Sequence, residues 1–353
     1  MAYTTINKHT DHFNTKLYTG NGGTQSITGV GFQPDWVWTK YRNDTYGHRL
    51  MDSVRGATKE IYSNNDGAET TTATGLTSFD SDGFTLGSSS GVNHNTGTYV
   101  SWNWKAGGSS SANSNGATAS TVSANTTAGF SIVKWTGTGS ATTVGHGLGA
   151  APTMIIVKNL ADANDWFVYS KGWGYLMSNP DPETDYVKFN QINGRADDAS
   201  AWNDTAPTAT VFSVGNASNS NGSSDPMIAY CFRDIPGYSK IGAYSGNNSS
   251  SGVFVYTGFK PAFIMFKRTD SNADWRVYDN KRYGNSVNDK FYYLEPNTSD
   301  TEGTTDSGGN WDMLSNGFRF YTSESEINGG GDYIYYAVGQ SLVGTNNVPC
   351  TAR

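Results

Sequence analysis

The chain has 353 residues, a formal net charge of −7 and 16% charged residues, against roughly 25% in an average soluble domain. An acidic balance without a lysine or arginine cluster argues against nucleic-acid binding, and no apolar run reaches the roughly 20 residues that span a membrane. Glycine and aromatic residues are abundant, with 42 Gly, 21 Tyr and 16 Phe. Aromatic residues favour strands and glycine favours turns, so the composition predicts an all-β protein with many loops.

The first thirteen residues are polar and carry no apolar core of a secretory signal. The two cysteines, Cys231 and Cys350, stand in an apolar run and in a polar tail, which argues against a disulfide framework. We therefore expect a protein that is made in the cytosol and folds without covalent staples.

Three segments of the chain repeat one pattern. A Gly-rich stretch leads to a proline, a lysine follows six residues later, and a large ring stands fourteen residues after the proline. The prolines are Pro34, Pro152 and Pro261, the lysines are Lys40, Lys158 and Lys267, and the rings are His48, Trp166 and Trp275. Equal spacing in three copies indicates an internal repeat.

The runs after the prolines, DWVWTK, TMIIVK and AFIMFK, predict strands that begin near each proline. The last two are apolar at successive positions, which is typical of a central strand covered on both faces. The lysine is expected where each strand meets water.

Further positions recur between the copies. Asp52 and Asp279 match, with Ser170 at the same place in the second copy. Each copy also has an asparagine followed closely by a glutamate: Asn64 and Glu69, Asn179 and Glu183, Asn297 and Glu302. The copies close with the aromatic runs YVSWNW, MIAYCF and YIYYAV, whose two-residue spacing predicts a last strand.

Copies of about 100 residues with several strands predict three tandem β-sandwich modules of the jelly-roll or concanavalin-like type. We place them at residues 1–106, 128–232 and 233–340, with a Gly/Ser/Thr/Asn-rich linker at 107–127 and a polar tail at 341–353. The period is too long for a solenoid, so we expect bead-like domains, the last two joined tightly through 233–237.

The signature of the first copy, GFxPDWVWxK, then RG, SDGFTLG and YVSWNWKAGG, resembles repeat modules of virion structural and tail-fibre-like proteins of tailed phages, particularly those of marine and cyanobacterial hosts. The third copy keeps much of it, and the second departs further. The resemblance implies concanavalin-like sandwich modules and a place on a phage particle, with other virion proteins as partners. A homo-oligomer is expected for such a part, with a trimer as the natural state of a fibre.

Catalytic and metal motifs are absent from the sequence. The five histidines show no zinc spacing, no GxSxG elbow is present, and each copy offers one recurrent glutamate where a glycosidase needs a facing pair of carboxylates. Loop capping is the preferred role for that glutamate. The acidic clusters at 181–185 and 298–302 leave Ca²⁺ as an alternative to the expectation of no cofactor.

Three aromatic residues in Gly-flanked loops, Trp173, Tyr175 and Tyr283, are the candidate ligand-binding residues. They would stack on sugars or anchor a protein interface, and their alternative role is to plug the end of a sandwich. The leading hypothesis is a non-enzymatic virion structural protein that presents a surface, with host recognition as one use of it. The alternatives are a capsid-decorating or tail-assembly part that binds only virion proteins, and a lectin for host surface glycans.

Overall fold

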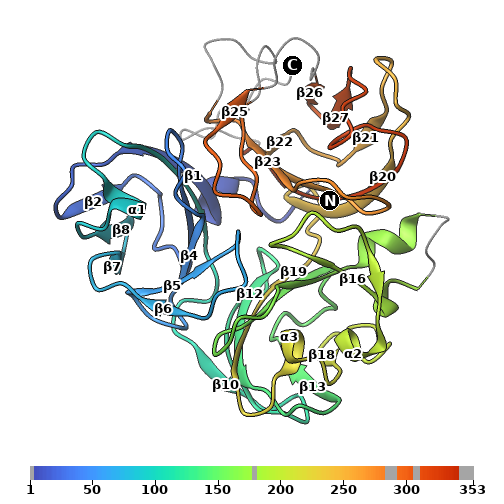
Figure 1. Cartoon of the computed structure of the whole chain (residues 1–353), viewed down its shortest axis with the longest axis horizontal. Helices are drawn as coiled ribbons and strands as arrows, with labels where there is room; N and C mark the ends of the chain where they lie inside the picture. The colour runs from blue at the N-terminus through green and yellow to red at the C-terminus, as the bar shows by residue number, and fades with distance from the viewer. Residues whose placement is uncertain (1–3, 177–180, 283–291, 305–310, 342–353) are drawn as a thin grey trace.

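The computed structural model describes residues 4–176, 181–282, 292–304 and 311–341, and it is all-β, as the composition predicts. Three lobes surround a common centre (Figure 1). The first lobe runs from strand β1 to β9, the second from β10 to β19 and the third from β20 to β28. The lobes occupy successive thirds of the chain, so each is built mainly from local sequence.

The first lobe contains two antiparallel sheets, of order β1-β9-β3-β4-β5-β6 and β2-β8-β7. Its elements are η1 (His9–Asp11), β1 (Phe13–Thr19), β2 (Gln25–Thr28), β3 (Trp36–Tyr41), β4 (Arg49–Asp52), β5 (Lys59–Tyr62), β6 (Thr70–Thr71), β7 (Leu76–Asp80), β8 (Gly83–Leu86), α1 (Ser90–Asn93) and β9 (Thr98–Trp104).

The second lobe has an eight-stranded sheet, β10-β11-β12-β19-β14-β15-β16-β17, and a small sheet, β13-β18. Its elements are β10 (Ser111–Asn113), β11 (Ser120–Asn125), β12 (Phe130–Thr136), β13 (Thr142–Gly145), β14 (Met154–Asn159), β15 (Phe167–Ser170), η2 (Lys171–Tyr175), η3 (Pro182–Thr184), β16 (Asp185–Lys188), β17 (Ala196–Asp197), α2 (Ala199–Trp202), β18 (Val211–Val214), α3 (Ser218–Asn221) and β19 (Pro226–Phe232).

The third lobe has sheets of order β20-β28-β22-β23 and β21-β27-β26, with a two-stranded pair β24-β25. Its elements are β20 (Ser239–Ser245), β21 (Phe254–Tyr256), β22 (Pro261–Arg268), β23 (Arg276–Asp279), β24 (Tyr292–Tyr293), β25 (Gly303–Thr304), β26 (Trp311–Leu314), β27 (Gly317–Phe320) and β28 (Asp332–Gly339).

The strand order of the main sheets recurs from lobe to lobe. The closing strand always lies between an early strand and the strand that follows the repeated proline: β1-β9-β3, β12-β19-β14 and β20-β28-β22. The prolines therefore precede or open the strands β3, β14 and β22, as expected for a residue that cannot donate to a ladder.

Each main sheet is buried on both faces. One face packs on the small sheet of its own lobe, as where Val37 of β3 joins a cluster with Ile27 and Phe84. The other face joins one apolar cluster at the centre, to which all three lobes contribute. There the Trp36 ring lies 4.4 Å from the Tyr230 ring, centroid to centroid. Burial on both faces explains why the strands β14 and β22 are apolar at successive positions. The three lobes share one apolar core, whereas the sequence predicted separate bead-like domains.

Residues 107–127 are not the expected linker. Strands β10 and β11 fall inside this range, and β11 pairs with β12 through residues such as Val122 and Val133. Strands β10 and β11 lie at one end of the sheet, where backbone hydrogen bonds hold them with few apolar side chains, so a Ser/Thr-rich composition does not exclude them. The tail expected at 341–353 lies outside the described residues apart from Ser341.

The two ends of the described chain meet between the third and first lobes. The rings of His9 and Tyr238 are 5.1 Å apart in an edge-on arrangement, and the Thr10 amide donates to the Ser341 hydroxyl at 3.3 Å. Between the second and third lobes, Asp234 accepts from the Ile241 amide at 2.8 Å and from the Thr153 hydroxyl at 3.1 Å. The joints are therefore fixed by specific polar contacts.

Truncation of the central cluster should destabilise the whole chain at once. We predict that Trp36→Ala lowers the free energy of unfolding by about 3–5 kcal/mol, because it leaves a cavity between two lobes. Urea unfolding followed by fluorescence and circular dichroism should show one transition in both proteins. Separate transitions for the lobes would contradict a shared core.

Candidate functional site

The three repeated lysines are buried, which corrects the expectation that they meet water. Lys40, Lys158 and Lys267 have no exposed surface. An ammonium group removed from water must find hydrogen-bond acceptors. Each lysine finds them in main-chain carbonyl groups of its own lobe: Tyr41 for Lys40 at 2.7 Å, Asn159 for Lys158 at 2.6 Å and Ala273 for Lys267 at 2.7 Å.

Each lysine also donates to a carbonyl of a neighbouring lobe. Lys40 of the first lobe reaches Ser299 of the third at 3.2 Å, Lys158 of the second reaches Asp66 of the first at 3.0 Å, and Lys267 of the third reaches Ile192 of the second at 2.8 Å. The three contacts run in one direction and close a ring of lobes. We call them the lysine links.

Burial lowers the pKa of all three lysines, while nearby aspartates oppose the shift. The pKa falls to about 8 for Lys40 and Lys158 and to about 7 for Lys267. Since the unfolded chain binds these protons more tightly, burying the three charged lysines costs stability near neutral pH, and this cost disappears as pH rises toward the unfolded pKa near 10. The lowered pKa reflects burial in an interface between lobes.

The repeated rings lie beside the lysine links. The Trp166 indole donates to the Tyr62 carbonyl of the first lobe at 3.0 Å, and the Trp275 indole to the Lys188 carbonyl of the second at 2.9 Å. His48 stands at the equivalent place and instead accepts from the Trp38 indole at 2.9 Å. The sequence-predicted signature is therefore the interface between lobes.

Two Asp–Arg pairs with the same three-residue spacing reinforce these interfaces. Arg55 pairs with Asp52, which accepts from the Tyr230 hydroxyl of the second lobe at 2.8 Å. The pair in the third lobe is equivalent. Arg282 donates to Asp279 at 2.6 Å, and Asp279 accepts from the Trp102 indole of the first lobe at 3.0 Å.

The second lobe breaks this pattern and buries an aromatic residue instead. Ser170 takes the place of the aspartate and Trp173 takes that of the arginine. Trp173 has no exposed surface and belongs to the central cluster. The proposed ligand-binding role of Trp173 is therefore wrong, because its ring fills the interface that an ion pair fills in the other two lobes.

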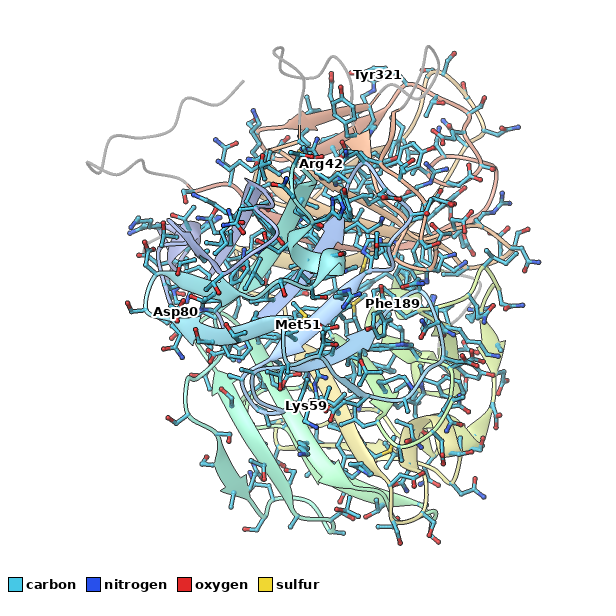
Figure 2. All side chains as sticks on the ribbon, turned by 60° about the vertical axis from the view of Figure 1, so that its left-hand side comes forward. Arg42, Met51, Lys59, Asp80, Phe189 and Tyr321 are labelled. Atoms are coloured by element: carbon cyan, nitrogen blue, oxygen red, sulfur yellow. The ribbon has the colours of Figure 1, made fainter. Side chains whose placement is uncertain are left out.

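Two of the three recurrent glutamates pair with arginines. Glu69 pairs with Arg55 of its own lobe at 3.3 Å, and Glu302 pairs with Arg42 of the first lobe at 2.7 Å. Figure 2 shows Arg42 where the first and third lobes meet. Glu69 and Glu302 are therefore structural, whereas Glu183 lines a surface pocket.

The asparagine of the second lobe was assigned to the wrong residue. Asn190 accepts from the Trp166 amide at 3.0 Å, just as Asn297 accepts from the Trp275 amide at 2.9 Å. Asn190 is thus the equivalent of Asn297, whereas Asn179 lies outside the described residues. A different insertion length between the lobes hid this register from the sequence.

A second set of repeated asparagines was missed by the sequence analysis. Asn93, Asn221 and Asn328 are fully buried, and each side-chain amide donates to three acceptors of surrounding loops. Each side-chain oxygen also accepts from a backbone amide of a loop far away in sequence: Asn21 donates to Asn93 at 2.9 Å, Thr138 to Asn221 at 2.9 Å and Asn247 to Asn328 at 3.2 Å. The spacing of these residues to the closing strand was the available signal.

Tyr175 is the candidate ligand residue that remains on the surface, with 60% of it exposed. It lines a pocket of about 270 Å³ in the second lobe together with Tyr169, Lys171 and Glu183. Tyr283, the third candidate, lies outside the described residues. Trp173 does not line this pocket.

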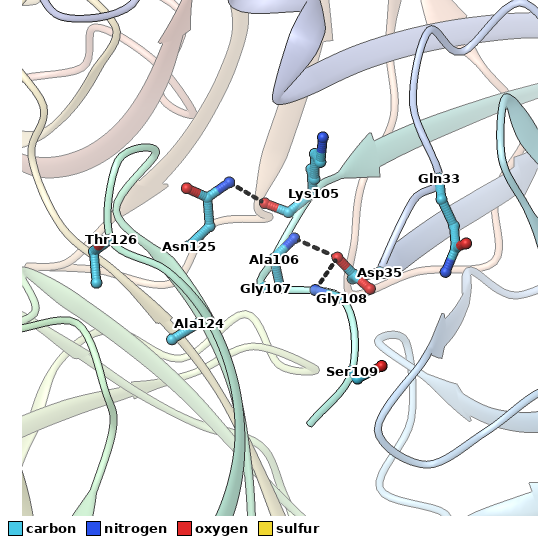
Figure 3. A pocket seen from close by; sticks show the side chains of 10 residues that line it. All are labelled: Gln33, Asp35, Lys105, Ala106, Gly107, Gly108, Ser109, Ala124, Asn125 and Thr126. Atoms are coloured by element: carbon cyan, nitrogen blue, oxygen red, sulfur yellow. Dashed lines mark hydrogen bonds between the residues drawn. The ribbon is translucent and has the colours of Figure 1, made fainter. Parts of the chain in front are cut away.

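A wider cavity of about 480 Å³ lies where the chain passes from the first lobe to the second. Figure 3 shows Asp35 directed at the backbone there, where its carboxylate accepts from the amides of Ala106 at 2.8 Å and Gly108 at 3.2 Å. Burial raises the pKa of Asp35, and these hydrogen bonds oppose the rise. The Asp35 carboxylate therefore fixes the segment around Ala106 and Gly108 that connects the first lobe to the second.

The outer sheet of the third lobe exposes aromatic residues. Phe254 and Tyr256 on β21 are 46% and 56% exposed, and Tyr321, which follows β27, is 37% exposed. Figure 2 shows Tyr321 at the outer edge of this lobe, and Arg319 lies 5.2 Å from its ring. We call these residues the aromatic face.

The aromatic face has no counterpart in the other lobes. Register places Ser26 and Thr143 at the position of Phe254, and Thr28 and Gly145 at that of Tyr256. Small polar residues and glycine are therefore compatible with this fold, and the aromatic residues are a specific property of the third lobe.

No group of three or more His, Cys, Asp or Glu side chains converges within the described part of the chain. Within the same residues, no helix is long and apolar enough to cross a membrane.

The comparison with protein families gives one match, to a domain of unknown function, DUF7483, over residues 8–341. The chain belongs to this family. One family model spans all three lobes, so the DUF7483 domain comprises the complete ring of lysine links. No curated protein and no solved structure matches the chain.

Removal of one lysine link should weaken the DUF7483 fold measurably. We predict that Lys158→Met lowers the free energy of unfolding by about 2 kcal/mol, because it leaves buried carbonyl groups without a donor. Lys134→Met, at a partly exposed lysine of β12, should change it by less than about 0.5 kcal/mol. Equal stability of the two variants in urea titrations would contradict a role for the links.

His48 should make stability depend on pH. Burial and the positive charges of Lys40 and Arg282 hold its pKa well below the ordinary value. Below a pH of about 6.5, His48 is therefore protonated in the unfolded chain but stays neutral in the native chain, so stability is lost as pH falls.

We predict that the stability advantage of the natural protein over His48→Gln shrinks by about 1.4 kcal/mol for each pH unit below about 6. Comparing the two proteins in urea between pH 7.5 and 5 cancels the contribution of other titrating groups. A difference that stays constant with pH would show that the native chain binds the His48 proton as readily as the unfolded chain, and would contradict the lowered pKa.

Proposed function

We propose that the chain is a non-enzymatic structural protein of a tailed-bacteriophage virion that attaches to the particle and presents a binding surface. In this proposal the three lobes are three copies of one concanavalin-like β-sandwich module. The second copy begins at residue 107, since β10 and β11 extend its sheet. The resemblance of the first copy to virion repeat modules is the starting point of the proposal.

The observation that carries the proposal is the role of the polar residues that recur from lobe to lobe. The lysines, the Asp–Arg pairs and Glu302 fix the lobes to one another. A protein whose recurrent buried charges hold its lobes together is suited to assembly, where a fixed shape must be held on a particle. Because one chain already supplies three lobes around a centre, the proposal does not depend on the expected homotrimer.

The aromatic face is the part of the surface best suited to contact another virion protein. Exposed aromatic rings beside an arginine are typical of the centre of protein interfaces. The other two lobes carry Ser, Thr or Gly at the same positions, so a partner that binds here selects the third lobe. This asymmetry would give a nearly three-fold body a single orientation on its support.

The proposal predicts that mass spectrometry of purified particles detects this chain at a constant ratio to the major virion proteins. Immunogold labelling of intact particles then separates the two locations. Label at the tail or fibre tips supports a role in host recognition, and label over the head supports a decoration protein. Absence from purified particles would refute the virion assignment.

The double variant Phe254→Ser with Tyr256→Thr gives the third lobe the residues, Ser and Thr, that the first lobe has at the equivalent positions 26 and 28. Its incorporation into particles should fall by about ten-fold, whereas Ser26→Ala with Thr28→Ala in the first lobe should leave incorporation unchanged. Normal incorporation of the first variant would exclude the aromatic face as the contact.

A further inference from the structure

The Tyr175 pocket exists because the second lobe departs from the other two. Trp173 turns inward where the other lobes have an arginine, and the short helix η2 then presents Tyr175 two residues later on the surface. The Ser170 hydroxyl fixes the start of η2 by accepting from the Gly172 amide at 3.1 Å. The pocket is therefore held by a locally rigid turn.

Aromatic and proline side chains form the walls of the pocket. Tyr169 is only 2% exposed and lines the pocket with its polar hydroxyl group. Pro152, Pro182 and Pro207 add apolar surface to the lining that includes Tyr175.

Lys171 and Glu183 add one positive and one negative group to the same pocket. Within the described residues neither takes part in a salt bridge, so both are available to a ligand. The charges balance, which gives the pocket no preference for an anion or a cation. A neutral ligand whose hydroxyl groups both donate and accept can use a carboxylate, an ammonium and a phenol together.

The volume limits the ligand to one ring. About 270 Å³ is below the roughly 300–1,000 Å³ of sites for drug-sized molecules. A proline-rich peptide would also favour a wall of tyrosine and proline, but it needs a row of slots repeating about every 9 Å along a polyproline helix. The single pocket with a balanced charged pair favours a sugar.

We infer that this pocket binds one neutral pyranose, such as the terminal residue of a glycan, with its apolar face on the Tyr175 ring. The Tyr169 hydroxyl, Lys171 and Glu183 bind the sugar hydroxyls. The inference deepens the proposed function by naming what the presented surface recognises, and its biological meaning rests on that function. The chemistry of the pocket can be tested on the isolated chain.

The test is titration of the full chain with methyl glucoside, methyl mannoside, methyl galactoside and N-acetylglucosamine, followed by NMR or calorimetry. At least one sugar should bind with a Kd on the order of 1 mM, as expected for one ring. Tyr175→Ala should weaken binding at least ten-fold, and Tyr169→Phe, which removes only the hydroxyl, several-fold. Tyr321→Ala, at an exposed tyrosine of the third lobe, should leave it unchanged.

Lack of binding by all four sugars, or binding that survives Tyr175→Ala with an intact circular dichroism spectrum, would overturn the inference. So would tighter, Tyr175-dependent binding of a proline-rich peptide. Failure of the virion assignment is recognised separately. The Tyr175→Ala variant should still enter particles, so loss of sugar binding with normal incorporation separates the two claims.

Discussion

A lysine ammonium buried between lobes must be surrounded by oxygen atoms, and in this fold one of those oxygens always belongs to the neighbouring lobe. The third lobe supplies the first, the first supplies the second, and the second supplies the third. A lobe that shifted within the closed body would deprive the lysine of one acceptor and leave the neighbouring carbonyl group without its donor. This constraint converts three similar lobes into one closed body, and the central aromatic cluster supplies the apolar burial that goes with it.

One of the three lobe interfaces contains an aromatic side chain where the other two contain an ion pair. Two interfaces contain a buried Asp–Arg pair bonded to a ring of the next lobe, and the third contains Trp173. Buried ion pairs can often be replaced by apolar residues of similar volume without loss of stability. The second lobe is an internal example of that exchange. Its consequence reaches the surface, because the turn that buries Trp173 also exposes Tyr175.

The sequence was sufficient for the fold class and for the strands after each repeated proline, since strand composition and the apolar runs are local properties. It was insufficient for the environment of Lys40, Lys158 and Lys267. A lysine at the end of an apolar run usually reaches water, and only the neighbouring lobe shows that it does not. The same holds for Trp173. Its Gly-flanked sequence predicts an exposed loop residue, and only the packing of another lobe against it shows that it is buried.

The prediction of a linker at residues 107–127 was wrong for a different reason. Val122 is their single large apolar residue, yet the backbone of β12 holds β11 in the sheet. The Tyr175 pocket was predicted in part, because Tyr175 was recognised as a loop aromatic. Tyr169, Lys171 and Glu183 come from separate elements, and nothing in their spacing indicates that they meet. The aromatic face was missed because Phe254 and Tyr256 look like core residues of a strand.

Native-state hydrogen exchange tests the central claim, that the lobes form one cooperative body, most directly. The account predicts that amides of the closing strands β9, β19 and β28 exchange only through global unfolding, with one common free energy that matches the value from urea titration. Exchange of one lobe at a free energy well below that of the other two would show that it opens alone, and would contradict the interdependence that the lysine links impose.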